Sequence, residues 1–278
     1  MKRFLDLFIF LSLDLHRMQK IRILLGYCFL SRYGCIKILG IRLHYLQGLK
    51  SHSLLILKEV FIKQIYTFSH ATDQKLNSAK NAVIIDVGAN IGVATAYFKH
   101  KYPKIKLIAI EASPVNYQEL VNNIKANKFQ NISTMNCFIS KEKKHIKFYH
   151  DIKKPGSSFG EGFRFRSSTN LKTFNVKTKK IEDIIGDLKN IVIKIDVEGS
   201  EYEILENLAS SKNISEVLEV LVEVSTYCQT DYNNLSKVIN KFYQLGFEPR
   251  LLTDQSTEVL NKKSIQNHIQ LNLVRCNS

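Results

Sequence analysis

Apolar and polar positions form regular blocks along most of this chain, and the blocks predict alternating strands and helices. From residue 82 onward, short runs rich in Ile and Val are separated by longer stretches in which apolar residues recur every three or four positions. The short runs are typical of buried strands, and the longer stretches are typical of amphipathic helices. The predicted strands cover 82–87, 106–111, 132–138, 190–195, 216–224, 247–253 and 268–275. The predicted helices cover 92–100, 114–127, 179–187, 200–211 and 232–245.

The order of these elements predicts an α/β fold with a mostly parallel, seven-stranded sheet. A polar stretch joins the last two predicted strands, so we expect them to pair as a hairpin and give the sheet an antiparallel edge. Residues 145–177 interrupt the alternation, because β-branched, aromatic and turn residues gather there. We expect a hairpin or excursion at this point, and long ordered loops in compact domains often carry function.

The first 80 residues follow a different pattern. Residues 1–40 mix apolar groups with Arg and Lys at loosely helical spacing, which predicts two or three short helices. Residues 54–66 show a clearer helical period, and a polar link follows over 69–81. We therefore expect a basic, mainly helical N-terminal appendage over 1–80 and an α/β domain over 81–278.

Composition and charge narrow the class of protein. The chain is 45% apolar and 23% charged, which is typical of a folded globular protein. Its formal net charge is +15, and residues 1–50 hold nine Lys or Arg against two Asp. Such a basic end would face anionic lipid, nucleic acid or an acidic glycan. The plainer alternative is that a lysine-rich composition simply yields a basic surface.

The N-terminal sequence and the cysteines indicate the cellular compartment of the protein. Asp6 and Asp14 bracket a short apolar stretch that no small-residue cleavage site follows. The stretch is shorter than the roughly 18–20 residues that span a bilayer. We therefore expect a helix packed on the domain, or one lying at a membrane interface, rather than a secretory signal. Five scattered cysteines without a CxxC pair are typical of a reducing compartment and argue against zinc. We expect a cytoplasmic protein whose basic end would contact the inner membrane face, with no metal site.

A glycine-containing turn follows the first predicted strand. Asp86 lies near the strand end, and Gly88, Asn90 and Gly92 follow it. Glycines lack the Cβ that would keep a ligand from the backbone, but the third glycine of a dinucleotide fingerprint is missing. A carboxylate before the turn favours a ligand with a cationic amino-acid part over a pyrophosphate. S-adenosylmethionine fits, since it carries an ammonium, a sulfonium and a ribose.

The next two strand ends offer partners for the rest of such a ligand. Glu111 ends the second predicted strand and would accept both ribose hydroxyls in charge-assisted hydrogen bonds. The alternative is an acid that only favours the start of the helix opening at Pro114. After the third strand, the segment beginning at Asn136 lies where an adenine would be held.

A second acid-rich turn follows the fourth predicted strand. Lys194, Asp196 and Glu198 share one side of an extended chain by the two-residue period. A lysine in an apolar strand needs a partner, which either acid would supply. Asp196 is therefore a candidate to bind an acceptor hydroxyl, act as a base or hold a cation, and the alternative is a structural ion pair. Glu223 closes the fifth strand toward the same edge.

Together these segments resemble the FkbM family of S-adenosylmethionine-dependent methyltransferases. The resemblance covers about residues 60–275 and is most specific in the block 192–201, whereas the glycine turn is shared with many methyltransferases. It implies a Rossmann-like methyltransferase fold that acts on a hydroxyl of a sugar, glycan or polyketide-type product. It also implies a set of roles: Asp86, Gly88, Asn90 and Gly92 at the methionine part of the cofactor, Glu111 at its ribose, and Asp196 and Glu198 at the methyl-transfer face.

We therefore expect an S-adenosylmethionine-dependent O-methyltransferase in which Asp196, helped by Lys194 or Glu198, orients or deprotonates a small-molecule or glycan acceptor. Similar proteins often carry Glu-x-His at the fifth strand end, whereas this chain has Ser225 in place of the histidine. One alternative is a nucleic-acid methyltransferase, but the motif that receives a flipped amino-bearing base is missing, so we do not expect a nucleic-acid partner. The other is a non-catalytic membrane or scaffold module that keeps the fold.

Overall fold

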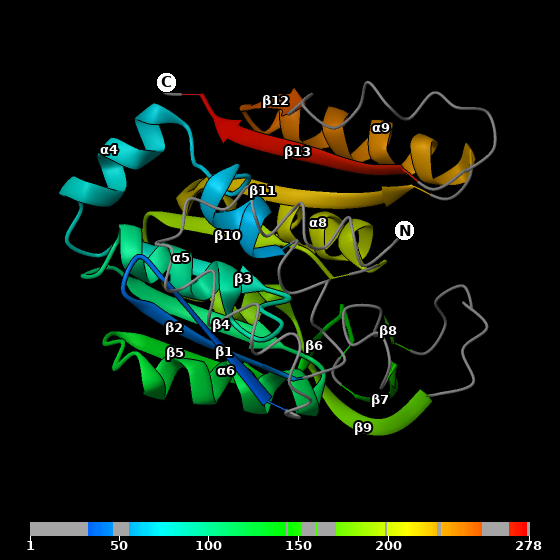
Figure 1. Ribbon diagram of the computed structural model, residues 1–278. Coiled ribbons are helices and arrows are strands. Elements are labelled where there is room, and N and C mark those ends of the chain that lie inside the picture. The colour runs from blue at the N-terminus through cyan, green and yellow to red at the C-terminus, as the bar shows by residue number, and fades with distance from the viewer. Residues whose placement is uncertain are drawn as a thin grey trace.

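A computed structural model describes most of the chain. The described residues are 33–46, 56–142, 144–151, 159–160, 171–197, 199–226, 229–251 and 267–276. Figure 1 shows a central sheet with helices on both faces and a smaller sheet beside one end of it. None of the described helices is both long and apolar enough to cross a bilayer.

The central sheet has the order β12-β13-β11-β10-β3-β4-β5. All neighbouring pairs from β11 to β5 are parallel, and β13 runs antiparallel to both β11 and β12. The mostly parallel sheet and its antiparallel edge are thus confirmed. The strands are β3 (Val83–Val87), β4 (Lys106–Glu111), β5 (Ile132–Asn136), β10 (Ile191–Ile195), β11 (Val217–Thr226), β12 (Phe247–Leu251) and β13 (Asn267–Arg275).

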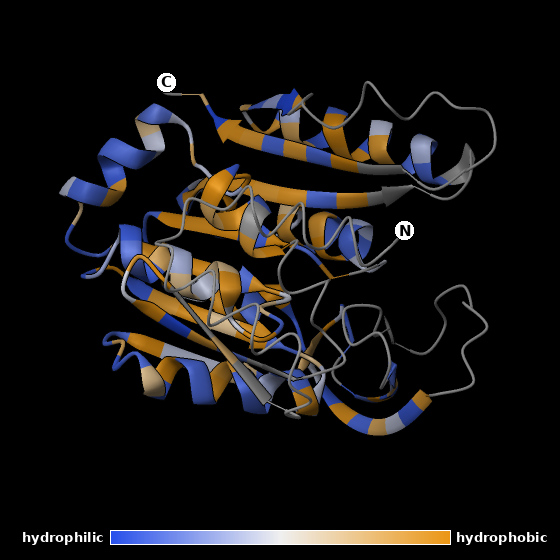
Figure 2. Cartoon of the chain, in the orientation of Figure 1, coloured by the Kyte–Doolittle hydropathy of each residue, from blue (hydrophilic) through white to orange (hydrophobic). Residues whose placement is uncertain are grey.

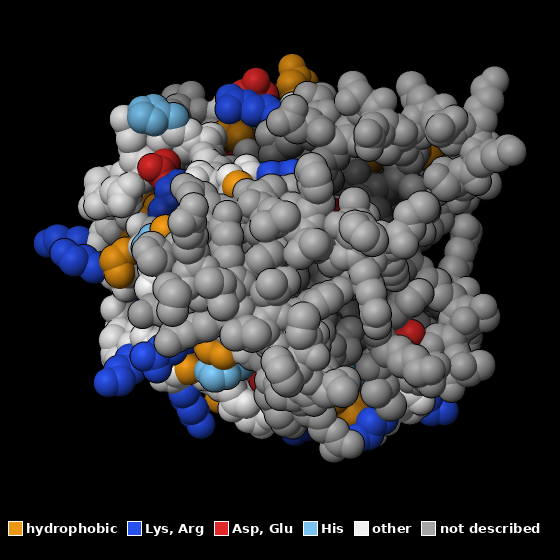
Figure 3. Space-filling view, viewed as in Figure 1, with side chains coloured by type: hydrophobic (Ala, Val, Ile, Leu, Met, Phe, Trp, Pro, Cys, Tyr) orange, Lys and Arg blue, Asp and Glu red, His pale blue; other side chains and the backbone are white. Residues whose placement is uncertain are grey.

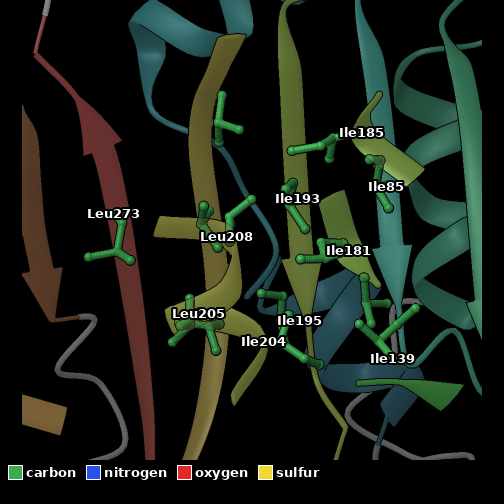
Figure 4. Close-up of a cluster of buried hydrophobic side chains, with 14 of the residues drawn as sticks. Ile85, Ile139, Ile181, Ile185, Ile193, Ile195, Ile204, Leu205, Leu208 and Leu273 are labelled. Carbon is green, nitrogen blue, oxygen red and sulfur yellow. The ribbon is translucent and has the colours of Figure 1, made fainter. Parts of the chain in front are cut away.

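Helices bury both faces of this sheet, which explains why its strands read as continuous apolar runs. Along β3, Ile84 packs into the core under one layer of helices and Ile85 into the core under the other. Figure 4 shows the second core, and Figure 2 shows apolar strands between helices of mixed polarity. The first layer holds α5 (Val93–Lys101) and α6 (Pro114–Ala126), and the second holds α7 (Ile181–Ile185), α8 (Glu201–Ala209) and α9 (Gln229–Gln244).

The interruption predicted at 145–177 is confirmed as a separate four-stranded sheet of order β6-β9-β7-β8. Its long strands β7 and β9 pair antiparallel, and Phe138, Phe148 and Val176 contribute to its own small core. This sheet lies beside the carboxyl end of β5, as Figure 1 shows. Its strands are β6 (Phe138–Ile139), β7 (His145–Asp151), β8 (Phe159–Gly160) and β9 (Leu171–Lys179).

The helical prediction for residues 1–40 is wrong where the structure describes that segment. Strands β1 (Tyr33–Ile38) and β2 (Ile41–Leu46) form an antiparallel hairpin, and residues 1–32 lie outside the described residues. Leu39 and Gly40 have φ of 47° and 84°, the left-handed pair that closes two-residue hairpins.

The hairpin also has partners that local spacing does not reveal. The amide groups of Asn123 on α6 and of Asn127, which caps the C-terminus of α6, bind the backbone N–H and C=O of His44 and Arg42, respectively, at 2.6–3.0 Å. These bonds satisfy polar groups on an edge strand and so favour a strand over a helix.

We call residues 56–69 the lead-in segment. It contains a short helical turn, η2 (Lys58–Ile62), and precedes α4 (His70–Ser78). The fully buried Glu219 carboxylate accepts hydrogen bonds from the backbone N–H and hydroxyl of Ser69 and from Asn272 Nδ2. Gln270 Nε2 donates to Ile65 O at 2.6 Å. The segment is therefore fixed against β11 and β13, and its apolar residues share a core with the first helix layer. A domain boundary at residue 80 stays a prediction.

The described surface carries the basic charge that composition indicates. Figure 3 shows Lys and Arg side chains spread around the rim of one face. Within the described residues, the ion pairs on the surface include Lys101 with Asp73 and Lys189 with Glu216. Such exposed pairs contribute about 0–1 kcal/mol each, so burial rather than surface charge stabilises the fold.

Candidate functional site

The carboxyl ends of β3, β4, β10 and β11 surround one cavity of about 180 Å³. Between β3 and β10 the chain order of the sheet reverses direction, and ligands of open α/β sheets bind at such switch points. Among the cavity's polar lining residues are Asn90, Glu111, Lys194, Asp196 and Glu223.

The glycine turn after β3 is folded against its neighbours. Gly88 and Ala89 both donate backbone hydrogen bonds to Ile110 O at 2.9 Å. Gly88 has φ of 76°, and a Cβ added there would lie 1.8 Å from the carbonyl oxygen of Asp196. At Gly92, with φ of 92°, a Cβ would lie 2.8 Å from Leu120 Cδ1. Both glycines thus serve close contacts within the protein, and their contact with a ligand stays a prediction.

Asp86 lies behind this turn rather than on the cavity lining. Its side chain is fully buried; Oδ2 accepts from Thr95 Oγ1 at 2.6 Å, and Oδ1 is 3.1 Å from Lys194 Nζ. The carboxylate therefore ties α5 and β10 to β3. Direct contact between Asp86 and the cofactor stays a prediction.

Lys194 is a buried cation that joins three segments. Its Nζ donates to Gly88 O at 2.8 Å and lies 3.7 Å from Asp196 Oδ2. Burial by itself would lower the pKa of Lys194, but attraction to Asp86 and Asp196 outweighs it and raises that pKa. Asp196 was an expected partner, whereas Asp86, which was not predicted as one, forms the shorter ion pair from the neighbouring strand, where it is paired in register with Lys194. Glu198 lies outside the described residues.

Asp196 combines a fixed oxygen with an open one. Its Oδ2 accepts a hydrogen bond from the Tyr66 hydroxyl at 3.0 Å. The side chain is 34% exposed, and no described residue donates a hydrogen bond to Oδ1. Nothing in the local sequence marks Tyr66 as a site residue, because a contact across 130 residues leaves no trace in local spacing.

Glu111 lines the cavity and is 7% exposed. Its two oxygens accept backbone hydrogen bonds from Asn90 at 2.7 Å and Ser113 at 2.8 Å. Burial raises the pKa of Glu111 to about 7, although both backbone donors favour the charged form. Asn90 has a left-handed φ of 52°, and its buried Oδ1 has no hydrogen-bond partner among the described residues.

Asn136 is exposed and lies outside the cavity lining. Its Nδ2 donates to Glu111 O at 2.8 Å and Ala112 O at 3.0 Å, so it fixes the chain that follows β4. The nearby lining is apolar and includes Phe138 and Phe148. Contact between Asn136 and an adenine stays a prediction.

Within the described part of the chain, no group of three or more His, Cys, Asp or Glu residues is placed to hold a metal ion. Buried His150 instead bonds to Ser113 Oγ through Nδ1 at 2.9 Å, and burial lowers its pKa. Ser113 in turn accepts from the Asn116 backbone at the start of α6. This histidine belongs to the framework beside Glu111.

Comparison with known proteins places this geometry in a family. A family model described as the methyltransferase FkbM domain matches residues 86–249. Methyltransferase sdnD of Sordaria araneosa is 27% identical over 196 residues, covering 60% of this chain and 73% of the relative. Methyltransferase 1 of Beauveria bassiana (strain ARSEF 2860) is 25% identical over 173 residues, covering 54% of this chain and 65% of the relative. A crystal structure of M. jannaschii TYW2 with AdoMet aligns at 13% identity and a TM-score of 0.44, covering 89% of each chain.

Proposed function

The chain belongs to the FkbM family of methyltransferases and uses S-adenosylmethionine, and from this premise we propose that it methylates a hydroxyl oxygen of a sugar, glycan or secondary metabolite. The observation that carries the proposal is the environment of Asp196. A carboxylate with one fixed oxygen and one open oxygen, on the lining of the cavity, is suited to orient a hydroxyl.

The cavity residues fit this cofactor, which supplies an electrophilic methyl group on a sulfonium sulfur when it is bound. Each oxygen of Glu111 accepts one backbone hydrogen bond and retains a lone pair for a ribose hydroxyl. The unsatisfied Oδ1 of Asn90 would accept from the ammonium group. The Phe138 and Phe148 side chains offer an apolar wall for the adenine.

Asp196 would carry the acceptor half of the reaction. Its Oδ1 would accept the hydrogen bond of the acceptor O–H and take that proton as the oxygen gains its methyl group. Because the side chain is one-third exposed, the proton then has a route to solvent. Lys194 keeps Oδ2 in a positive field, and positioning of the acceptor oxygen would supply much of the rate.

The proposal is tested by finding the acceptor in cells. Surface glycans and small metabolites are compared by mass spectrometry between cells that express the wild-type protein and cells that express Asp196→Ala. We expect one class of molecule to be lighter by one CH2 unit in the variant cells, because a hydrogen stands where the wild-type product carries a methyl group. Calorimetric titration should show that Asp196→Ala still binds S-adenosylmethionine. A methyl group found instead on RNA, DNA or protein would contradict the proposed acceptor class.

The pH dependence of cofactor binding tests Glu111. Two ribose hydroxyls both donate, so they bind the carboxylate better than the neutral acid. With a pKa of about 7, Glu111 gains charge as pH rises, and the affinity for S-adenosylmethionine should rise about tenfold between about pH 6 and about pH 8. Calorimetric titration at several pH values measures the affinity for S-adenosylmethionine. The Glu111→Gln variant should lose the part of the pH dependence that comes from the Glu111 carboxylate.

The matched control is Glu182→Gln, which changes an exposed acid of α7 in a surface ion pair with Lys180. It should keep the wild-type pH dependence. An affinity that varies with pH equally in the wild type and in Glu111→Gln would show that another group titrates.

A further inference from the structure

We infer that Tyr66 is a positioning residue of the methyl-transfer reaction: its hydroxyl holds one oxygen of Asp196 so that the other oxygen meets the acceptor. The inference rests on the proposed role of Asp196 as the acceptor-binding carboxylate. It adds to the site a residue of the lead-in segment, which lies before the stretch matched by the family model.

One hydrogen-bond donor and one cation converge on the same oxygen of Asp196. The Tyr66 hydroxyl donates to Oδ2 at 3.0 Å, and Lys194 Nζ lies 3.7 Å from that atom. The ammonium of Lys194 also lies 5.3 Å from the centre of the Tyr66 ring, within range of a cation–π contact. Because the Tyr66 hydrogen bond and the Lys194 charge both act on Oδ2, the carboxylate keeps one rotation and Oδ1 is left for an incoming hydroxyl.

Tyr66 is itself held in place on both sides along the chain. Its side chain is 6% exposed, and its ring lies 6.4 Å from that of Phe98, centre to centre. The preceding residue, Ile65, accepts the 2.6 Å hydrogen bond from Gln270, and Ser69 is bound to buried Glu219. The hydroxyl therefore reaches Asp196 from a segment that the sheet has already ordered, which lowers the entropy cost of holding the carboxylate.

The surroundings keep the Tyr66 hydroxyl protonated. Burial raises the pKa of Tyr66 well above its usual value, and the negative charges of Asp196, Glu223 and Asp86 raise it further. Lys194 is the cation that faces the same group. A tyrosine in this environment donates a hydrogen bond and does not act as a base.

Tyr66→Phe tests the inference, since it keeps the ring and removes only the hydroxyl. We expect kcat to fall about tenfold to a hundredfold because the carboxylate loses its orientation. The acid limb of the pH–rate profile should move to higher pH, because the charged carboxylate has lost a donor. The KM for S-adenosylmethionine should stay near the wild-type value. A purely structural role for Tyr66 would not move the acid limb.

The matched control is Tyr102→Phe. Tyr102 is also buried and also donates to an aspartate, Asp73, but this pair lies outside the cavity lining. We expect this variant to lose stability without a change in the pH–rate profile. The assay follows transfer of the labelled methyl group of S-adenosylmethionine to the acceptor fraction extracted from cells that express Asp196→Ala.

Two outcomes separate this inference from the proposed function. If Asp196→Asn keeps wild-type turnover, the proposed role of Asp196 fails. If Asp196→Asn is inactive while Tyr66→Phe shows the wild-type kcat and an unmoved acid limb, the role of Tyr66 is overturned. Wild-type affinity for S-adenosylmethionine verifies that the Tyr66→Phe variant is folded. The inference is supported if this variant binds the cofactor, has a lowered kcat and shows an acid limb of the pH–rate profile moved to higher pH.

Discussion

Replacing Asp196 by asparagine is expected to lower kcat by about a thousandfold, while the affinity for S-adenosylmethionine changes little. The substitution keeps the size of the side chain and an oxygen that accepts from Tyr66, but it removes the negative charge that would take the acceptor proton. Lys194 keeps its ion pair with Asp86, so the framework should survive. Single-turnover transfer of a labelled methyl group measures the loss, and calorimetric titration measures cofactor affinity.

Asp73→Asn is the matched control, because Asp73 also accepts from a tyrosine and pairs with a lysine, at Tyr102 and Lys101, away from the cavity. It should cost about 1 kcal/mol of stability and leave kcat unchanged. The proposed role of Asp196 would be contradicted if Asp196→Asn kept most of the wild-type kcat. It would also be contradicted if cofactor affinity and kcat fell together by the same factor.

The strands of the central sheet were predictable because the signal for each strand lies within its own short stretch of sequence. Strands buried on both faces must be apolar at nearly every position, so β3 and β10 appear as short Ile- and Val-rich runs that end at a turn. The first predicted strand, 82–87, and the observed one, Val83–Val87, differ by a single residue. The start of α6 was also predictable, because Ser113 caps it and Pro114 suits a first turn.

The unpredicted parts depend on contacts between distant segments. The β1–β2 hairpin gains hydrogen bonds from Asn123 of α6 and from Asn127 just after it, which lie about 80 residues away in the chain and leave no periodic signal. Tyr66 reaches Asp196 across 130 residues in the same way. One partner was within reach of sequence reasoning, because Asp86 and Lys194 lie near the carboxyl ends of strands that neighbour one another in this fold.

Gly88→Ala should give the largest loss of stability, about 4 kcal/mol or more, together with loss of cofactor binding. The added Cβ would lie 1.8 Å from Asp196 O, a separation that no side-chain rotation relieves because the backbone fixes the position of the Cβ and the oxygen is itself a backbone atom. To relieve it, the turn after β3 must move away from the end of β10. That movement breaks the hydrogen bond from Lys194 to Gly88 O and the one from Asp196 N to Val87 O. Urea unfolding and calorimetric titration measure the two losses.

Gly246→Ala separates this contact from backbone strain. Gly246 has φ of 82°, close to the 76° of Gly88, but a Cβ there would find its nearest neighbour, Arg275 Nη1, only at 4.0 Å. An alanine in the left-handed region costs about 1–2 kcal/mol, so Gly246→Ala should lose about that much and still bind the cofactor. The excess loss in Gly88→Ala then measures the close approach of the two strand ends that build the site. Equal losses of stability in the two variants would contradict that contact. The positive φ at position 88 would then be the sole reason for a glycine in this turn.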